Sequence, residues 1–171
     1  MAASVSNTNS SDRELPLRIA TDADVAAITP LINAAFVVER PIFDHDRIDD
    51  IGVRDLMAKG KFLLHENPAG KLISCVYLEP SSDGRCYLGL LSIAPGHQGT
   101  GLGQRVLARA EKFARDAGSH TMWLRTLSAR IPPLRPYYER FGYTLLEMAP
   151  LPPVLQSKIP CEFVVMEKGL S

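Results

Sequence analysis

The sequence predicts a mixed α/β domain built on one central, mostly antiparallel sheet flanked by helices. The 171 residues, of which 46% are hydrophobic and 22% charged, have the size and composition of one globular domain. Segments with helical periodicity alternate with short apolar, β-branched runs. Three such runs follow one another with tight turns between them, which indicates an antiparallel meander and disfavours a fully parallel sheet.

The first fourteen residues are small and polar, and they predict a flexible tail before a single folded domain at 15–171. They contain no apolar segment of the kind found in secretory signal peptides. The three cysteines, Cys75, Cys86 and Cys161, have no paired spacing and are expected to be free thiols. We therefore expect a cytoplasmic protein.

The chain is expected to begin with a short strand and two helices. Residues 15–20 form the strand, and Thr21 with Asp24 resembles a capping box at the start of the first helix. Apolar residues then recur at spacings of three and four, namely Val25, Ile28, Leu31, Ile32 and Ala35. A second short helix is predicted at 49–59, where Gly60 ends it.

The meander is predicted from three strands at 62–65, 72–79 and 86–93. Turn-forming sequences rich in Pro, Gly, Asn, Asp and Ser separate them at 67–70 and 80–84. The third strand is apolar almost throughout, so it is expected to be central and buried on both faces.

The second half of the chain begins with a glycine-rich loop that leads into a long helix. This helix has a continuous apolar face and ends near Ala117, because Gly118 follows. The remaining expected elements are a strand at 122–126, a short helix at 134–141, and two strands at 143–148 and 163–166 joined by a proline-bearing connector.

The glycine-rich loop, Gln98-Gly99-Thr100-Gly101-Leu102-Gly103, is the strongest candidate for a binding site. Free backbone N–H groups at a helix start bind anions, and glycines let a phosphate approach the backbone closely. The loop lacks the GK[ST] end of a P-loop and the GxGxxG spacing of a dinucleotide site. The predicted ligand is therefore a phosphate compound of another kind.

Two motifs resemble the GNAT superfamily of acyl-CoA-dependent N-acetyltransferases. The loop matches the family pattern [QR]xxGx[GA] through Gln98, Gly101 and Gly103. About forty residues later the run Tyr137-Tyr138-Glu139-Arg140-Phe141-Gly142-Tyr143 matches the family signature aromatic-Tyr-x-[KR]-x-Gly-aromatic. The expected order of elements is also similar to that of the family.

This resemblance implies that acetyl-CoA is the cosubstrate. Its pyrophosphate would bind the loop amides, and its pantetheine arm would lie along the strand that ends at Ile93. That strand and the strand at 122–126 would splay apart, and a strand amide would polarise the thioester carbonyl. The implied cofactor-binding residues are Leu91, Ser92, Ile93, Gln98, Gly99, Thr100, Gly101, Leu102, Gly103 and Gln104.

Tyr138 matches the general acid of the family. A phenol within hydrogen-bond reach of the CoA sulfur can protonate it as the amine displaces it. The alternative role for a tyrosine on a short amphipathic helix is core packing, for which Tyr137 and Tyr143 are the better candidates.

The general base of the reaction is not evident. Many family members carry a glutamate on the central strand or its neighbour, but the strand at 86–93 contains no carboxylate. Glu79 is expected to be a solvated strand end, with a role as a base acting through water as the alternative. Glu39, Asp44 and Asp46 are expected to be solvated charges near the acceptor. A water chain, or an amine that arrives neutral, would replace the base.

A second departure from the family lies in the turn after the strand at 122–126. Many relatives have an asparagine there, whereas this chain has Ser128 followed by Arg130. Ser128 is a partial replacement for the asparagine contact. Arg130 is either exposed or directed at the acceptor or a phosphate.

The function expected from these features is direct transfer of acetyl from acetyl-CoA to a primary amine on a small molecule or peptide. A non-catalytic acyl-CoA-binding sensor or interaction module is the alternative. Scattered histidines and unpaired cysteines predict no metal site. The net charge of zero argues against nucleic acid, and no apolar run reaches the about 20 residues of a membrane helix.

The charges near the expected acceptor site leave two acceptor classes open. Five carboxylates favour a cationic acceptor such as a polyamine or aminoglycoside, namely Glu39, Asp44, Asp46, Asp49 and Asp50. Arg40, Arg47 and Arg130 equally suit an acceptor carboxylate, as in an amino acid or peptide. The proline-bearing connector is a candidate homodimer contact.

Overall fold

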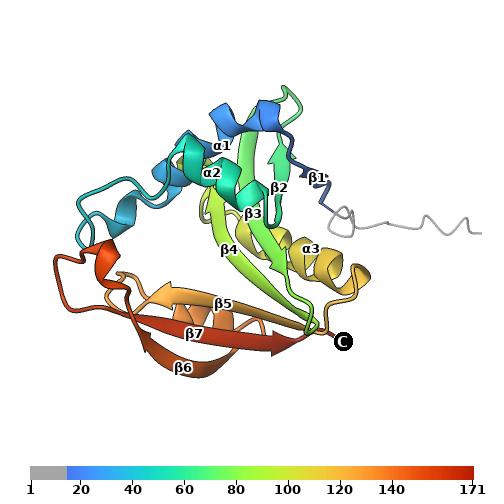
Figure 1. Ribbon diagram of the computed structural model, residues 1–171. Coiled ribbons are helices and arrows are strands. Elements are labelled where there is room, and N and C mark those ends of the chain that lie inside the picture. The colour runs from blue at the N-terminus through green and yellow to red at the C-terminus, as the bar shows by residue number, and fades with distance from the viewer. Residues whose placement is uncertain (1–14) are drawn as a thin grey trace, which may run out of the picture.

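A computed structural model describes residues 15–171 and places seven strands in one mixed sheet, in the order β1-β2-β3-β4-β5-β7-β6 (Figure 1). The predicted tail at 1–14 lies outside the described residues. The strands are β1 (Arg18–Ile19), β2 (Lys61–Glu66), β3 (Leu72–Pro80), β4 (Arg85–Ile93), β5 (Thr121–Leu127), β6 (Thr144–Pro150) and β7 (Glu162–Gly169). The helices are α1 (Val25–Ala35), α2 (Asp50–Met57), α3 (Leu102–Asp116) and α4 (Arg135–Glu139). The predicted mixed α/β class and element order are confirmed.

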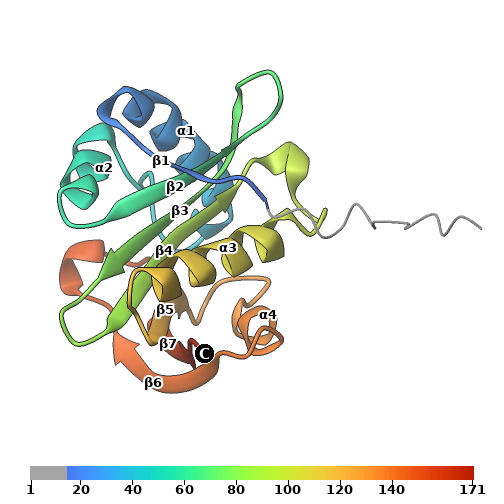
Figure 2. The same ribbon diagram turned by 90° about the vertical axis from the view of Figure 1, so that its right-hand side faces the viewer.

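The predicted meander is present as β2, β3 and β4, which pair antiparallel. Alternate side chains of these strands enter two cores. Leu63, Val76 and Leu88 pack with α3 on one face of the sheet. Phe62 and Tyr77, with other residues of the same strands, pack with α1 on the opposite face. Figure 2 shows α3 on one side of the sheet and α1 and α2 on the other, as the period of two in each strand requires.

Local signals explain where the helices begin and end. The Asp49 carboxylate accepts a hydrogen bond of 2.7 Å from the Gly52 amide and thereby caps α2. The Thr21 amide donates to Asp24 at 2.7 Å, which confirms the expected capping box before α1. Gly118 follows α3 with a φ of 98°, a conformation that favours glycine.

The central strands β4 and β5 separate along their length. They are the parallel pair of the sheet, and their pairing covers only Arg85 to Tyr87 of β4. Beyond Tyr87 the two strands diverge, as Figure 1 shows. The divergence leaves backbone groups of β4 without a partner strand on that side, which confirms the splay implied by the family resemblance.

A β-bulge in β4 lies beside this opening. Cys75 pairs with Ser92 and Tyr77 pairs with Gly89, so that two β4 residues, Leu90 and Leu91, stand opposite one β3 residue. Leu90 has a φ of 52°, which is unusual for a side chain of this size. Bulges re-aim the side chains and backbone groups that follow, and this one occurs where the sheet opens.

The proline-bearing connector between β6 and β7 folds back on its own chain. The Lys158 amide donates to the Ile42 carbonyl at 2.8 Å, and the Lys158 ammonium pairs with Asp44 at 2.8 Å. Ile42 and Phe43 pack there against Leu155 and other apolar residues of the connector and of β5 and β7. This packing forms a wall at the open end of the sheet. A homodimer contact through the connector stays a prediction.

Candidate active site

Two cavities meet where β4 and β5 splay apart. The loop cavity, about 560 Å³, borders the glycine-rich loop. The Glu39 cavity, about 210 Å³, lies between the segment that follows α1 and the ends of β5 and β7. Both are lined by Phe36, Leu91, Arg130, Leu134 and Tyr138. These shared residues define the junction of the two cavities, so a ligand in one can reach a ligand in the other.

Most of the predicted cofactor-binding residues line the loop cavity. They are Leu91, Ile93, Gln98, Gly99, Gly101, Gly103 and Gln104. The side chains of the other three are directed elsewhere. The hydroxyl of Ser92 donates to the Leu90 carbonyl, and that of Thr100 donates to the His97 carbonyl. The side chain of Leu102, the first residue of α3, is buried in the core. None of these three residues lines the loop cavity, so their place in the cofactor site stays a prediction.

The loop has the geometry of an anion site. Gly99 and Gly101 have φ values of 74° and 82°, and no atom lies within 4 Å of the position that a Cβ would occupy at either. Gly101 is the N-cap of α3, whose first amides have no intrahelical partner. The Gln98 side chain donates to the Ile93 carbonyl at 3.1 Å and ties the loop to the end of β4. The open backbone and the helix N-terminus together suit a phosphate.

Tyr138 lies at the junction of the two cavities. It comes from α4 and is only 6% exposed. Its ring packs edge-on against Tyr137 and Tyr143, at centroid distances of 5.2 Å and 5.6 Å. Its hydroxyl forms no hydrogen bond within the described part of the chain. Burial raises its pKa, so the hydroxyl keeps its proton at neutral pH and is available as a donor.

The neighbouring tyrosines have other surroundings. The Tyr143 hydroxyl donates to Glu111 at 2.9 Å, and Glu111 also pairs with Lys168 at 2.9 Å. This buried network joins α3 to the sheet, which confirms the expected packing role of Tyr143. Tyr137 is partly buried and packs edge-on against Phe141 beside the loop cavity.

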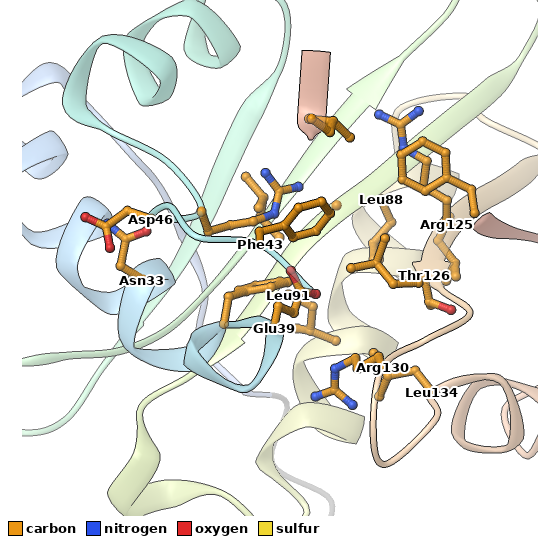
Figure 3. A pocket seen from close by; sticks show the side chains of 18 of the residues that line it. Asn33, Glu39, Phe43, Asp46, Leu88, Leu91, Arg125, Thr126, Arg130 and Leu134 are labelled. Atoms are coloured by element: carbon orange, nitrogen blue, oxygen red, sulfur yellow. The ribbon is translucent and has the colours of Figure 1, made fainter. Parts of the chain in front are cut away.

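Glu39 is the buried carboxylate of the second cavity, and the expectation of a solvated charge is wrong for it. The 3₁₀ turn after α1 turns its side chain inward, where it is 8% exposed, and Figure 3 shows it directed into the cavity. Burial raises its pKa, and Arg47 and Arg130 partly offset that rise. Apolar residues three before and three and four after it, Phe36, Ile42 and Phe43, are the sequence signal that could have indicated its burial.

The other candidate carboxylates match the expectation more closely. Asp44 pairs with Lys158 and is 82% exposed. Asp46 pairs with Arg40 at the rim of the Glu39 cavity and is 62% exposed. Glu79 accepts a hydrogen bond of 2.7 Å from Tyr77 and lines neither cavity. Of the four carboxylates, only Glu39 is buried at the site.

Arginines and aromatic rings complete the Glu39 cavity. Arg130 lies in the turn between β5 and α4, as Figure 3 shows, and donates to the Pro132 carbonyl at 2.6 Å. The Ser128 hydroxyl instead accepts a hydrogen bond of 2.9 Å from the Glu162 amide, and Ser128 lines neither cavity. The lining residues that sequence reasoning did not select include Phe36, Phe43, Tyr87, Arg125 and Phe163. Phe36 and Phe43 flank Glu39, whereas Tyr87, Arg125 and Phe163 come from β4, β5 and β7, so no single local pattern connects all five.

The two core cysteines are unsuited to nucleophilic chemistry. Cys75 and Cys86 are fully buried and line neither cavity. Burial raises the pKa of Cys75 to about 12 and that of Cys86 to about 11. Because the thiolate is the nucleophile, neither residue is reactive at neutral pH.

Neither a membrane-spanning helix nor a side-chain cluster suited to a metal ion occurs in residues 15–171. No helix there is long and apolar enough to cross a membrane. In the same residues no three His, Cys, Asp or Glu side chains gather in a way that could hold a metal ion.

Comparison with known proteins identifies similar chains. A streptothricin acetyltransferase from Streptomyces lavendulae is 34% identical over 53 residues, which are 31% of this chain and only 28% of that relative. The solved structure of a ribosomal-protein-alanine N-acetyltransferase from Brucella melitensis is 20% identical, with a TM-score of 0.71 over 91% of this chain and 100% of that one. That of an IAA acetyltransferase from Bacillus cereus is 15% identical, with a TM-score of 0.70 over 91% and 99%. At these identities the structures show a shared fold.

A family model provides the wider match. The model described as the acetyltransferase (GNAT) family matches residues 25–143. That range takes in α1, the segment of Glu39, the splayed strand β4, the glycine-rich loop and Tyr138. It covers well over half of the chain and includes both motifs on which the resemblance was based. The chain therefore belongs to the GNAT family of acetyltransferases.

Proposed function

We propose that the protein transfers an acetyl group from acetyl-CoA directly to a primary amine, with the cosubstrate in the loop cavity and the amine in the Glu39 cavity. Membership of the GNAT family implies acetyl-CoA as cosubstrate. We place each ligand in its cavity on the basis of the groups that line that cavity. The loop cavity has the open glycine backbone that a pyrophosphate needs, and the Glu39 cavity has the buried carboxylate that an amine needs.

The cosubstrate arm would lie along β4. Backbone groups of β4 beyond Tyr87 have no β5 partner, and Leu91 and Ile93 line the loop cavity. An extended pantetheine chain can pair with such groups as an added strand would. A free amide near the bulge at Leu90 and Leu91 would then donate to the thioester carbonyl and stabilise the charge that develops there.

Tyr138 carries the proposal. A water molecule takes one proton from the ammonium group, and the neutral amine attacks the thioester carbonyl. The carbon–sulfur bond then breaks, and the Tyr138 hydroxyl donates its proton to the departing sulfur. The second proton lost by the amine nitrogen returns to the Tyr138 oxygen, so the products are the amide, free CoA thiol and one proton in water. Its place at the junction, its burial and its retained proton all suit this role. The raised pKa values of Cys75 and Cys86 support direct transfer over an acyl-enzyme.

The test is release of free CoA thiol from acetyl-CoA in the presence of a broad panel of amines. We expect turnover with at least one amine class, and none without an amine. The streptothricin, ribosomal-protein-alanine and IAA acetyltransferases among the similar proteins justify antibiotic, peptide and small-molecule members of the panel. CoA binding with no turnover of any amine would instead indicate an acyl-CoA-binding module.

A further inference from the structure

We propose that the acceptor is a small amino-acid-like compound, in which Glu39 binds the ammonium group and Arg47 and Arg130 bind an anionic group such as a carboxylate. This inference rests on the proposed function and narrows its acceptor. It follows from three features of the Glu39 cavity, which are an unpaired buried carboxylate, two arginines without carboxylate partners, and a positive charge surplus.

The first feature is the isolation of Glu39. No side chain between residues 15 and 171 forms a hydrogen bond or ion pair with its carboxylate, although the residue is 8% exposed. An ionised carboxylate in such surroundings is costly unless a cation or hydrogen-bond donors compensate it. A ligand ammonium in the cavity toward which the side chain points would supply both.

The second feature is the state of the four arginines that line the cavity. Arg40 is neutralised by Asp46. Arg125 is held between two rings, with its guanidinium 5.6 Å from the centroid of Tyr87 and 4.4 Å from that of Phe163. Arg47 and Arg130 remain, and neither has a carboxylate partner closer than 4.0 Å among the described residues.

These two arginines are also positioned for a common ligand. Both line the cavity into which the Glu39 side chain points, so both border the place where an ammonium would bind. Arg47 extends over the Phe36 ring at 5.6 Å, and Arg130 uses one nitrogen for the Pro132 carbonyl. A guanidinium has five N–H donors, so both arginines retain donors for a carboxylate, which they can bind in bidentate form.

The third feature is the overall charge and size of the cavity. Its lining contains four arginines, namely Arg40, Arg47, Arg125 and Arg130, and two carboxylates, Glu39 and Asp46. This surplus of two positive charges repels a polycation and attracts a ligand that carries an anionic group. The volume of about 210 Å³ suits a small molecule, and the walls between the charges are largely apolar and aromatic.

The experiment compares matched amines in the thiol-release assay. Leucine, leucinamide and 3-methylbutylamine share a side chain and differ in the carboxylate, and phenylalanine, phenylalaninamide and 2-phenylethylamine form a second series. Spermidine represents polycations, and a short peptide represents protein N-termini. We expect the amino acid of the better series to exceed its amide and its decarboxylated amine by at least roughly 10-fold in kcat/KM, because a charge-assisted hydrogen bond contributes on that scale.

Substitutions then test which charged side chain binds which group of the acceptor. Arg47→Gln and Arg130→Gln should each raise KM for the amino acid and lower the acid-to-amide ratio of kcat/KM by roughly 10-fold or more. Glu39→Gln should lower kcat/KM for the acid and the amide alike, because both carry the ammonium. Arg54→Gln is the matched control, because Arg54 is exposed on α2 and lines neither cavity, and it should leave the ratio unchanged. An unaltered thermal shift with CoA shows that each variant is folded.

The outcomes separate this inference from the proposed function. A preference for spermidine, the peptide or the amides would overturn the acceptor assignment and leave the acetyltransferase function intact. An acid-to-amide ratio that does not respond to Arg47→Gln or Arg130→Gln would overturn the role of the arginines. If no amine of any kind is turned over, the proposed function itself fails, and the acceptor assignment fails with it.

Discussion

Three tyrosines within seven residues differ in what their hydroxyl groups can do. Tyr143 is committed to Glu111, Tyr137 packs beside the loop cavity, and Tyr138 reaches the junction with its hydroxyl unpaired among the described residues. Removing the hydroxyl of Tyr138 should therefore affect chemistry more than structure. We expect Tyr138→Phe to lower kcat by roughly 10²–10⁴-fold, nearer the lower limit because a thiolate is a fair leaving group. Binding of acetyl-CoA should change little.

Tyr137→Phe is the control for this prediction, because the ring is adjacent and its hydroxyl has no assigned task. Steady-state kinetics of the two variants with one amine make the comparison. Equal, small losses in both would remove Tyr138 from the mechanism. Loss of acetyl-CoA binding in Tyr138→Phe would show that its hydroxyl is structural.

Gly101 permits a second prediction at the scale of one residue. Its φ of 82° is strained for valine, and a side chain would enter the open space where the phosphate is expected. CoA at about 100 times its Kd should stabilise the wild type by about 2.7 kcal/mol. That corresponds to a rise in Tm of roughly 5–10 °C. We expect Gly101→Val to abolish most of this shift in a thermal-melt assay.

Gly70 supplies a matched control for the backbone strain. It has the same φ of 82° and the same open surroundings, but it lies in the turn between β2 and β3. Gly70→Val should lower the Tm of the free protein by a similar amount and keep the full CoA shift. A Gly101→Val protein with a full CoA shift would contradict the loop as the phosphate site.

At the scale of elements, one charged cluster joins the start of the domain to the sheet. Arg18 of β1 pairs with Asp24 at 2.7 Å and with Glu66 of β2 at 2.5 Å. The hydrogen bond from Arg18 is the largest influence that lowers the pKa of Asp24 from 3.8 to about 2. A carboxyl whose pKa is depressed in the folded state adds stability above its unfolded pKa, and that stability is lost as the pH falls through the folded value.

We therefore expect Asp24→Asn to lower the free energy of unfolding at pH 7 by about 1 kcal/mol, because Arg18 is 45% exposed and solvent screens the pair. The difference between wild type and variant should shrink as the pH falls from about 4 to about 2. Urea unfolding at a series of pH values measures it. Asp116→Asn, which breaks the exposed pair with Lys112 inside α3, should have a smaller effect. A difference that does not vary with pH would refute the linkage.

At the scale of the whole molecule, the site exists because the sheet is divided. Strands β1 to β4 form one part of the sheet, and β5 to β7 form the other part, which diverges from β4 beyond Tyr87 (Figure 1). Exchange-labile amides at that opening are expected to be paired only when a cosubstrate arm is present. CoA should therefore slow hydrogen exchange at residues 88–93 and 98–103, and leave β6 unchanged. Protection confined to other elements would contradict the placement of the cosubstrate between the strands.

Much of the fold and one half of the site were predictable because they depend on local sequence. Strand alternation, the turn residues of the meander and the glycine at the end of α3 act over a few residues. The glycine-rich loop and the Tyr138 signature are also continuous segments, so both could be located directly in the sequence, while their chemical roles stay proposals. β1 is shorter than expected, at Arg18–Ile19, because pairing with β2 decides where an edge strand ends.

The Glu39 cavity, which is the proposed acceptor half of the site, was decided by tertiary structure. Glu39, Arg47 and Arg130 come from three segments, and their shared cavity exists only once the connector before β7 has packed against Ile42 and Phe43. Sequence alone listed these charges and left open whether they recognise a cation or an anion. The burial of Glu39 and the pairing of Arg40 with Asp46 are the structural facts from which we propose an acceptor that carries both an ammonium and an anionic group. Such information resides in long-range packing, because the cost of a charge depends on what surrounds it in space and not on its neighbours along the chain.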